Sequence, residues 1–376
     1  MQANYSDRLG PRRAEILAWY EAEEDNLRAM LDRLEAAAPI EAAHAGYLLH
    51  VFWMAQGAYT EEHERLRGLL ARDGLPDQSR AELLARLSDV QGRLGLVEAA
   101  AAADREALAL AEPGTDPHWL AAVGLALHAV HRGDTEEAVR LGRQALEEAE
   151  RLDDASRINA IGNLATILMG VNRTEEARSV LERFVHESRR SGLALETSGL
   201  ADLGWLDLLE HDYEAARAAY AAALTQLRSR ADKVYELETL KGLGLASLGL
   251  GQRGDARAAF ADMLELALAG TREHSAHIAG ALSGIALAAD PAAADRAARL
   301  RGAVAQLNSD ADVVMNAYSR ADDELELHFE RQLVVVLGEE AWEREKTAGS
   351  KMTLEQAIAL ARSLSGHSPR AVAAES

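Results

Sequence analysis

The chain contains 376 residues, and its hydrophobic content of 48% is enough for two or three domains or for one long array with a continuous core. Its 61 acidic residues outnumber its 40 basic residues, and the resulting formal charge of −21 argues against direct binding to nucleic-acid phosphates. The absence of cysteine excludes disulfide bonds, thiolate metal sites and a cysteine nucleophile.

The first predicted element is an N-terminal helical cap over residues 1–40. Within it, RRAEILAWYEAEEDNLRAMLDRLEAA has apolar residues at helical spacing and is predicted to form an amphipathic helix. The residues before it lack the apolar core of a signal peptide, and no run of about 18 apolar residues follows. We therefore expect a cytoplasmic protein without a membrane partner. The apolar face of the cap consists of Ile16, Trp19, Tyr20, Leu27, Leu31 and Leu34.

A repeated pattern of helix, short turn and helix occupies residues 41–305. When Ala138 is taken as the reference position, the spacing of its equivalents grows from 37 residues (His63 to Ala100) to 41 residues (Ala256 to Ala297). A period of this length indicates stacked supersecondary units. The copies are GAYTEEHERLRGLL at 57, GLVEAAAAADREAL at 95, HRGDTEEAVRLGRQAL at 131, NRTEEARSVLERFV at 172, HDYEAARAAYAAAL at 211, GQRGDARAAFADML at 251 and, more weakly, AAADRAARLRGAVAQL at 292, with Ala177 and Ala216 as the remaining equivalents.

The residues at the turns explain how each copy folds. Asp134 and Asp212 are placed to accept hydrogen bonds from free backbone N–H groups at the start of the second helix. The small reference residue lets the two helices approach closely, and His63 predicts different packing in the first copy, as is common for terminal repeats. We predict an all-α fold, a right-handed superhelical solenoid of antiparallel helix hairpins.

The segment over residues 306–364 is predicted to be a helical closing segment, followed by a disordered tail over residues 365–376. It contains LVVVLG at 333, the one β-branched run in the chain, inside a helical pattern. Before it, the stretch from Ala269 to Pro291 is rich in alanine and poor in large side chains, which predicts a weak hairpin and a hinge.

Turns such as EHDYEAARAAYAAAL resemble those of tetratricopeptide repeats (TPR), although the family's usual period is 34 residues. Three segments carry a closer likeness: WYEAEEDNLRAMLDRLEAA at 19, VFWMAQGAYTEEHERLRGLL at 51 and LGEEAWEREKTAGSKMTLEQAIALARS at 337. They resemble the sensor regions of bacterial STAND-type transcription regulators, both maltose-regulator-like and antibiotic-regulator-like. The resemblance covers about residues 13–364.

The resemblance implies a receiver that is attached to a nucleotide-binding module and a DNA-binding module. The sequence contains no GxxxxGK[ST] phosphate loop, because GSKMT at 349 lacks the upstream glycine and a preceding strand. No basic helix-turn-helix is visible either. We therefore expect the sensor arm alone, either excised or encoded as a separate protein.

Candidate catalytic and metal sites find little support. His128, His131 and Asp134 have a spacing that a metal ion could use, but they fall at a helix end, where capping is the favoured interpretation. His274 and His277 repeat the spacing without a suitable carboxylate. Acidic pairs are frequent on exposed helical faces, and no Gly-X-Ser-X-Gly elbow occurs. We predict no enzyme activity, no metal and no cofactor.

The first helices of stacked hairpins line a concave groove, so polar or aromatic residues on these helices are candidate ligand contacts. Trp205 stands out, because an indole offers a flat apolar surface and an N–H donor; the alternative is that it packs between hairpins. The other candidates are Glu82, Asp89, Arg93, Asn159, Thr166, Ser198, Glu238 and Lys241.

These observations favour a TPR-like sensor or scaffold domain of a bacterial transcriptional regulator, which binds a peptide, a protein or a small inducer in its groove. The first alternative is a stand-alone adaptor for protein–protein interaction. The second is a small-molecule-binding or catalytic solenoid protein of secondary metabolism. The chain is expected to be a monomer or a homodimer.

Overall fold

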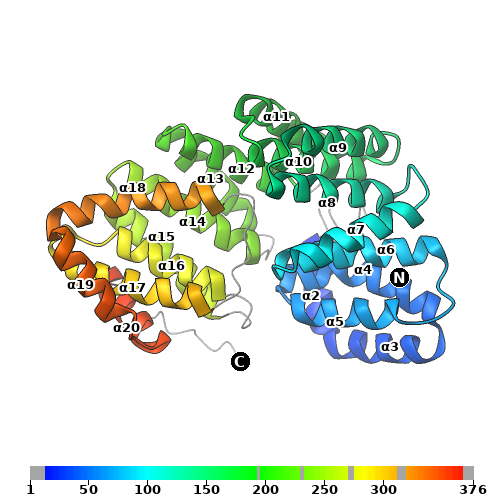
Figure 1. Ribbon diagram of the computed structural model, residues 1–376, viewed down its shortest axis with the longest axis horizontal. Coiled ribbons are helices and arrows are strands. Elements are labelled where there is room, and N and C mark those ends of the chain that lie inside the picture. Colours follow the sequence, from blue (N-terminus) through cyan, green and yellow to red (C-terminus); the bar gives the residue numbers. More distant parts are fainter. Residues whose placement is uncertain (1–12, 193–194, 229–232, 270–274, 311–318, 367–376) are drawn as a thin grey trace. The chain divides into compact units, whose positions relative to one another are not determined.

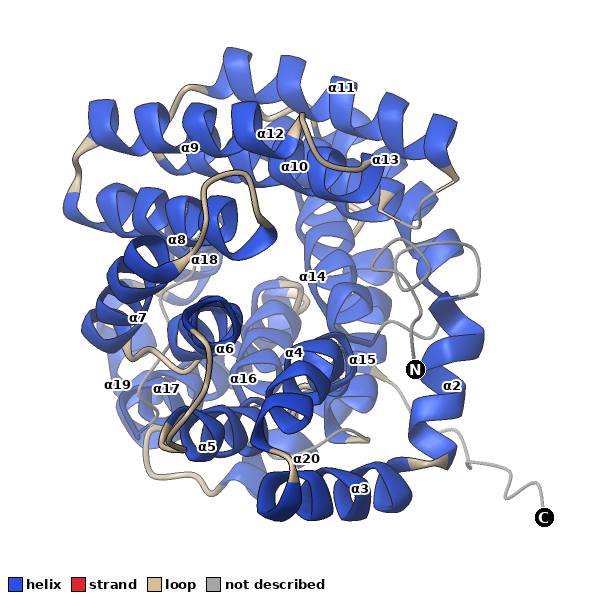
Figure 2. Ribbon diagram, turned by 90° about the vertical axis from the view of Figure 1, so that its right-hand side faces the viewer, coloured by secondary structure: helices blue, strands red, loops and turns tan. Residues whose placement is uncertain are grey.

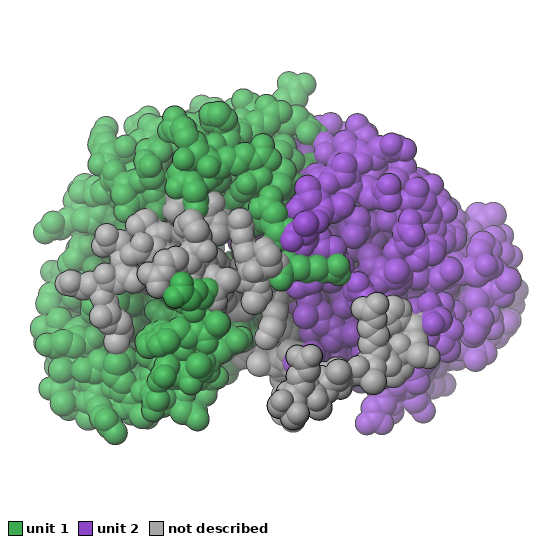
Figure 3. Space-filling model, turned by 180° about the vertical axis from the view of Figure 1, so that it is seen from behind, with its two compact units in different colours: residues 1–203, 226–232, 314–319 green, residues 204–225, 233–313, 320–376 purple. Residues whose placement is uncertain are grey.

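The computed structural model describes residues 13–192, 195–228, 233–269, 275–310 and 319–366, and these are helical outside short turns, with no strand among them (Figures 1 and 2). The chain divides into two compact units, each described by itself (Figure 3). Unit 1 contains residues 1–203, 226–232 and 314–319, and unit 2 contains residues 204–225, 233–313 and 320–376.

Unit 1 begins with α2 (Arg13–Ala22) and α3 (Glu24–Ala37), followed by paired helices. Its pairs are α4 (Pro39–Gln56) with α5 (Tyr59–Leu70), α6 (Asp77–Arg93) with α7 (Val97–Leu110), α8 (Asp116–Arg132) with α9 (Thr135–Ala149), and α10 (Asp154–Gly170) with α11 (Thr174–Ser191). Within unit 1, each pair also packs against the next.

The helices α12 (Glu196–Leu209) and α13 (Tyr213–Arg228) are divided between the two units. Unit 2 continues with α14 (Lys233–Gly249), α15 (Arg253–Leu268), α16 (Ser275–Leu287), the short 3-10 helix η2 (Pro291–Ala293), α17 (Ala294–Asp310), α18 (Ser319–Leu337), α19 (Glu339–Gly349) and α20 (Leu354–Ser365). Within unit 2, α14 pairs with α15 and α16 with α17. The predicted all-α fold of stacked helix hairpins is therefore confirmed.

The hairpin turns share one backbone conformation. The residue two positions before the second helix has a left-handed φ between 60° and 76° in six hairpins, and four of the six residues are glycine. The next N–H then donates to the carbonyl five residues earlier, as in Asp134 to Ala129 at 2.9 Å. This is the Schellman arrangement, in which glycine takes the left-handed position without a Cβ clash. The six residues are Gly57, Gly95, Gly133, Asn172, His211 and Gly251.

The predicted turn contacts and small reference residues are confirmed, with one correction. The Asp134 carboxylate accepts from the backbone N–H of Glu137 at 3.4 Å, and that of Asp212 accepts from Ala215 at 3.1 Å. Each reference alanine lies three residues into its helix and is at most 1% exposed. By that rule the equivalent in α5 is Glu62 and not His63. The first spacing becomes 100 − 62 = 38 residues, and a carboxylate occupies the buried position.

The N-terminal prediction needs correction as well. The predicted single helix is two helices, α2 and α3, with the break at Glu23. Tyr20, Leu27 and Leu31 are buried as expected, but Trp19 is 51% exposed. Tyr20 packs against Phe52 of α4, with 5.3 Å between the ring centres, and Trp19 lies about 100° away around the same helix, so its indole faces outward.

The C-terminal half contains close helix contacts where the sequence predicted looseness. Gly284 in α16 lies so near the Phe260 ring of α15 that an added Cβ would be 2.2 Å from it, so this alanine-rich helix is tightly packed. Within the stretch from Ala269 to Pro291, where a hinge is predicted, residues 270–274 lie outside the described residues, as do residues 367–376 of the predicted tail. Residues 333–337 of LVVVLG form the end of α18, in keeping with the predicted helical pattern. None of the described helices is long and apolar enough to cross a membrane.

Candidate functional site

Three of the predicted groove residues lie on one face of α6. Glu82, Asp89 and Arg93 are spaced by seven and four residues, and Arg86 lies between them on the same face. Arg93 Nε is 3.4 Å from Asp89 Oδ1. The Arg86 guanidinium lies 4.5 Å from the centre of the Tyr47 ring of α4, in a cation–π contact. This first helix of a hairpin therefore presents charges of both signs in a row, which we call the α6 stripe.

Behind the α6 stripe, a histidine joins two carboxylates from neighbouring hairpins. His50 Nδ1 of α4 lies 2.6 Å from Glu62 Oε1 of α5, and His50 Nε2 lies 3.2 Å from Asp89 Oδ2 of α6. The side chains of His50 and Glu62 are 7% and 0% exposed. The sequence did not predict this triad, because with His63 at the reference position the buried carboxylate of Glu62 is not aligned with the alanine of the later copies.

The protonation of the triad follows from its burial and its neighbours. Burial lowers the pKa of His50, but the carboxylates of Glu62 and Asp89 together outweigh burial, and the pKa rises above its ordinary value. Burial raises the pKa of Glu62. Desolvation opposes ionisation of Asp89, yet Arg93 and the hydrogen bond with His50 hold its pKa well below its usual range. The His50 ring therefore links the first hairpin to the second through its contacts with Glu62 and Asp89.

A second buried pair joins the second hairpin to the third. His128 Nε2 of α8 is 3.2 Å from Asp104 Oδ2 of α7, and their side chains are 10% and 2% exposed. A glycine gives the carboxylate its space, because a Cβ at Gly124 would lie 2.1 Å from Asp104 Oδ2. Burial raises the pKa of Asp104. His128 thus pairs across the hairpins, while His131 Nδ1 lies 2.8 Å from the Leu127 carbonyl and caps the end of α8.

The remaining predicted residues of unit 1 are half-buried. On α10, Asn163 Nδ2 donates to the backbone oxygen of Asn159 at 3.1 Å and to its Oδ1 at 3.2 Å. Thr166 Oγ1 donates to the Gly162 carbonyl at 3.2 Å, and Ser198 Oγ donates at 2.8 Å to the carbonyl of Leu195, the residue before α12. The first helices α6, α8 and α10 pack in this order within unit 1. The α6 stripe and the Asn159–Thr166 face therefore lie on two first helices that are separated by α8.

The other three predicted residues belong to unit 2. Trp205 on α12 is half-buried, so part of its indole is open to solvent. Glu238 on α14 is exposed, whereas Lys241 is half-buried with its Nζ 4.0 Å from Glu326 Oε1 of α18. The structure therefore brings Lys241 next to α18, a contact that the sequence did not predict.

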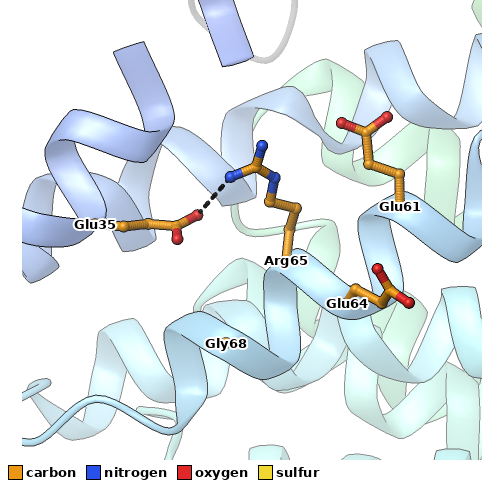
Figure 4. Close-up of a pocket in the computed structure, with 5 residues that line it drawn as sticks. All are labelled: Glu35, Glu61, Glu64, Arg65 and Gly68. Carbon is orange, nitrogen blue, oxygen red and sulfur yellow. Dashed lines mark hydrogen bonds and ion pairs between the residues drawn. The ribbon is translucent and has the colours of Figure 1, made fainter. Parts of the chain in front are cut away.

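A cavity of about 340 Å³ lies between α3 and α5 in unit 1, lined by Glu35, Glu61, Glu64, Arg65 and Gly68 (Figure 4). Arg28 donates to both oxygens of Glu61, at 2.8 and 2.6 Å, and this lowers the pKa of that carboxyl. Arg65 reaches Glu35 at 3.3 Å.

The chemistry of this cavity is that of surface ion pairs. General acid catalysis needs a carboxyl whose pKa is raised, and the pKa of Glu61 is shifted in the opposite direction. Among the residues that the structure describes, no group of three histidine, aspartate or glutamate side chains is arranged to hold a metal ion.

Comparison with models of protein families finds no match for the sequence, and neither does comparison with curated proteins. Among solved structures, a Rap protein complexed with competence and sporulation factor is similar to this chain, with 15% identity and a TM-score of 0.55 over 85% of this chain and 81% of that one. A signal-transduction ATPase with numerous domains and a tetratricopeptide-repeat sensor, from Pyrococcus horikoshii, is similar at 14% identity and a TM-score of 0.53. That match covers 83% of this chain and 47% of the ATPase. These similarities establish a TPR-like fold.

Proposed function

We propose that the chain is a TPR-like sensor or scaffold domain of a bacterial transcriptional regulator, and that it binds a peptide, a protein or a small inducer on the first-helix face of unit 1. The observation that carries the proposal is the α6 stripe, in which Glu82, Asp89 and Arg93 share one face. A peptide carries donors, acceptors and charges of both signs, and such a row of alternating charges complements it. Nucleic acid fits poorly, given the net charge of −21.

The regulatory context in this proposal rests on two similarities. The Rap protein is complexed with competence and sporulation factor, and the Pyrococcus protein has a tetratricopeptide-repeat sensor. Both have the same kind of fold as this chain. In the proposed regulator, residues 1–40 form a cap, residues 41–305 the sensing array and residues 306–364 the closing segment. If the array has two conformations and a ligand binds one of them more tightly, the ligand shifts the equilibrium toward that conformation. This shift is the signal to an attached module.

Native mass spectrometry of the protein purified gently from its own host tests the proposed site. The informative variant is E82Q/R93Q, which removes one charge of each sign from the α6 stripe and leaves Asp89 and its histidine in place. The matched control is R105Q/E106Q on the exposed face of α7, because it also keeps the net charge unchanged. We expect a bound molecule on the wild type and the control, and at least about a tenfold loss of occupancy in E82Q/R93Q. A bare wild-type chain, or occupancy equal in all three proteins, would refute this location.

The unit 2 candidates need a separate variant. Trp205→Ala removes the half-buried indole without touching the α6 stripe. Loss of the bound molecule in Trp205→Ala, with unchanged thermal stability, would add Trp205 to the binding surface. Lower thermal stability with full occupancy would assign the indole to packing between hairpins.

A further inference from the structure

Helix α18 interrupts the order of stacking in unit 2. The helices before and after it, α17 and α19, pack directly against each other. Their contact is so close that a Cβ at Gly302 would lie 1.9 Å from the Lys346 carbonyl oxygen, and one at Gly349 would lie 1.8 Å from that of Arg299. The α17–α19 pair therefore continues the array, and α18 is an insertion between its two members.

The side chains of α18 reach helices far away in the sequence. Phe329 lies 6.4 Å from Tyr213 of α13, measured between ring centres, and His328 lies 6.4 Å from His211 in the turn before α13. Gln332 accepts from Arg253 Nη2 of α15 at 3.3 Å. One stretch of α18, residues 326–332, thus contacts successive hairpins of unit 2, and in Figure 1 it runs beside α14 and α15.

Two glutamates of α18 face basic and hydroxyl groups of the array. Glu326 Oε2 accepts from Ser283 Oγ of α16 at 2.6 Å and from Arg301 Nη1 of α17 at 2.9 Å. Arg301 also contacts Glu330 Oε2 at 2.6 Å. Lys241 of α14 lies 4.0 Å from Glu326. Because α14 and α16 are first helices, these contacts place α18 on the face that is predicted to bind a ligand.

The two faces of α18 differ in chemistry. Leu325, Phe329 and Leu333 are at most 6% exposed and alternate with the two glutamates on the buried side. On the other side, Leu327 and Val335 are 46% and 83% exposed. The buried face reads Glu-x-x-Phe-Glu-x-x-Leu from residue 326 to 333, with acidic groups and apolar anchors one turn apart.

We propose that the first-helix face of unit 2 is a docking surface for an acidic amphipathic helix, and that α18 occupies it as a built-in, displaceable ligand. The occupant from a partner is a helix with the same Glu-x-x-Phe-Glu-x-x-Leu spacing, recognised by Lys241, Ser283 and Arg301 and by the Tyr213 ring. Ion pairs, hydrogen bonds and the buried side chains of Leu325, Phe329 and Leu333 hold α18 in place, and a second helix of the same chemistry can make the same contacts. The inference concerns unit 2 and does not depend on the ligand proposed for unit 1.

The test uses the full chain and a fluorescent synthetic peptide of residues 320–337 as the probe. In the chain, E326Q/E330Q weakens the attachment of α18 and leaves the docking surface intact. The matched control is E339Q/E340Q, which makes the same change of charge at exposed positions of α19. We expect fluorescence anisotropy to show at least about tenfold tighter binding of the peptide to E326Q/E330Q than to the wild type or the control. A peptide with both glutamates replaced by glutamine should lose this binding.

Hydrogen exchange of the wild-type chain gives a second test that needs no folded variant. If α18 is displaceable, its amides at residues 325–333 exchange faster than the buried amides of α14 and α16, because the helix opens without global unfolding. Equal exchange in α18 and in those helices would overturn the proposal. So would a folded E326Q/E330Q protein that binds the peptide no better than the wild type, since α18 would then be a permanent part of the array.

Discussion

At the scale of single residues, the His50 triad predicts how stability depends on pH. The pKa of His50 is raised in the folded chain, so the folded state holds this proton more tightly than the unfolded state. The stabilisation is fully present below about pH 6.5, the ordinary pKa of histidine, and is lost as the pH rises through the folded-state pKa. The raised pKa of Glu62 acts in the same direction.

We therefore expect the Tm of the wild type to fall as the pH rises above about 6.5, and His50→Gln to flatten this dependence. His131→Gln, a change at an exposed histidine, is the control and should keep the wild-type slope. Thermal unfolding followed by circular dichroism checks both. The same slope in His50→Gln and in the wild type would mean that the triad does not hold the proton in this way.

Gly124→Ala tests the close packing of Gly124 against the buried carboxylate of Asp104, and Gly68→Ala is its control. Gly124→Ala puts a methyl group 2.1 Å from Asp104 Oδ2, so the carboxylate must move away from His128. We expect a loss of about 1–3 kcal/mol in the free energy of unfolding. Gly68→Ala in α5 meets nothing within 4 Å and should stabilise by about 0.5–1 kcal/mol, because alanine favours a helix interior. Urea denaturation measures both, and a Gly124→Ala protein as stable as the wild type would contradict the packing described here.

At the scale of elements, the shared turn makes a graded prediction. Gly133 has a φ of 76° and open space around it, so Gly133→Ala tests backbone strain alone. We expect a loss of about 1 kcal/mol with alanine and a smaller loss with asparagine, which tolerates the left-handed conformation better. Urea denaturation measures the free energy of unfolding of the two variants and shows which is the more stable. Equal stability of both would argue against strain at this turn.

The turns also show why most elements were predictable and α18 was not. Glycine, asparagine and aspartate at fixed distances from a buried alanine are local signals, so the helix pairs could be located from the sequence. The sites of Glu62 and Glu326 depend on partners that lie 12 residues away at His50 and 43 residues away at Ser283. Such pairings leave no period in the sequence. The α6 stripe lies between these cases, because helical spacing predicted its shared face and only the structure showed the triad behind it.

At the scale of the whole molecule, a repeat array predicts that damage stays local. Each hairpin is stabilised by itself and by its immediate neighbours, so a substitution is felt over one or two hairpins. His50→Gln should therefore speed amide exchange in α4, α5 and α6, where the triad residues lie, and leave the exchange of α14 to α16 unchanged. E326Q/E330Q should have the converse effect, because the partners of both glutamates lie in unit 2. Hydrogen exchange followed by mass spectrometry measures the amide exchange of each helix in both variants. If His50→Gln raised exchange equally across both units, the chain would unfold as one cooperative body, and a ligand on the α6 stripe could then stabilise the docking surface of α18 without any contact with it.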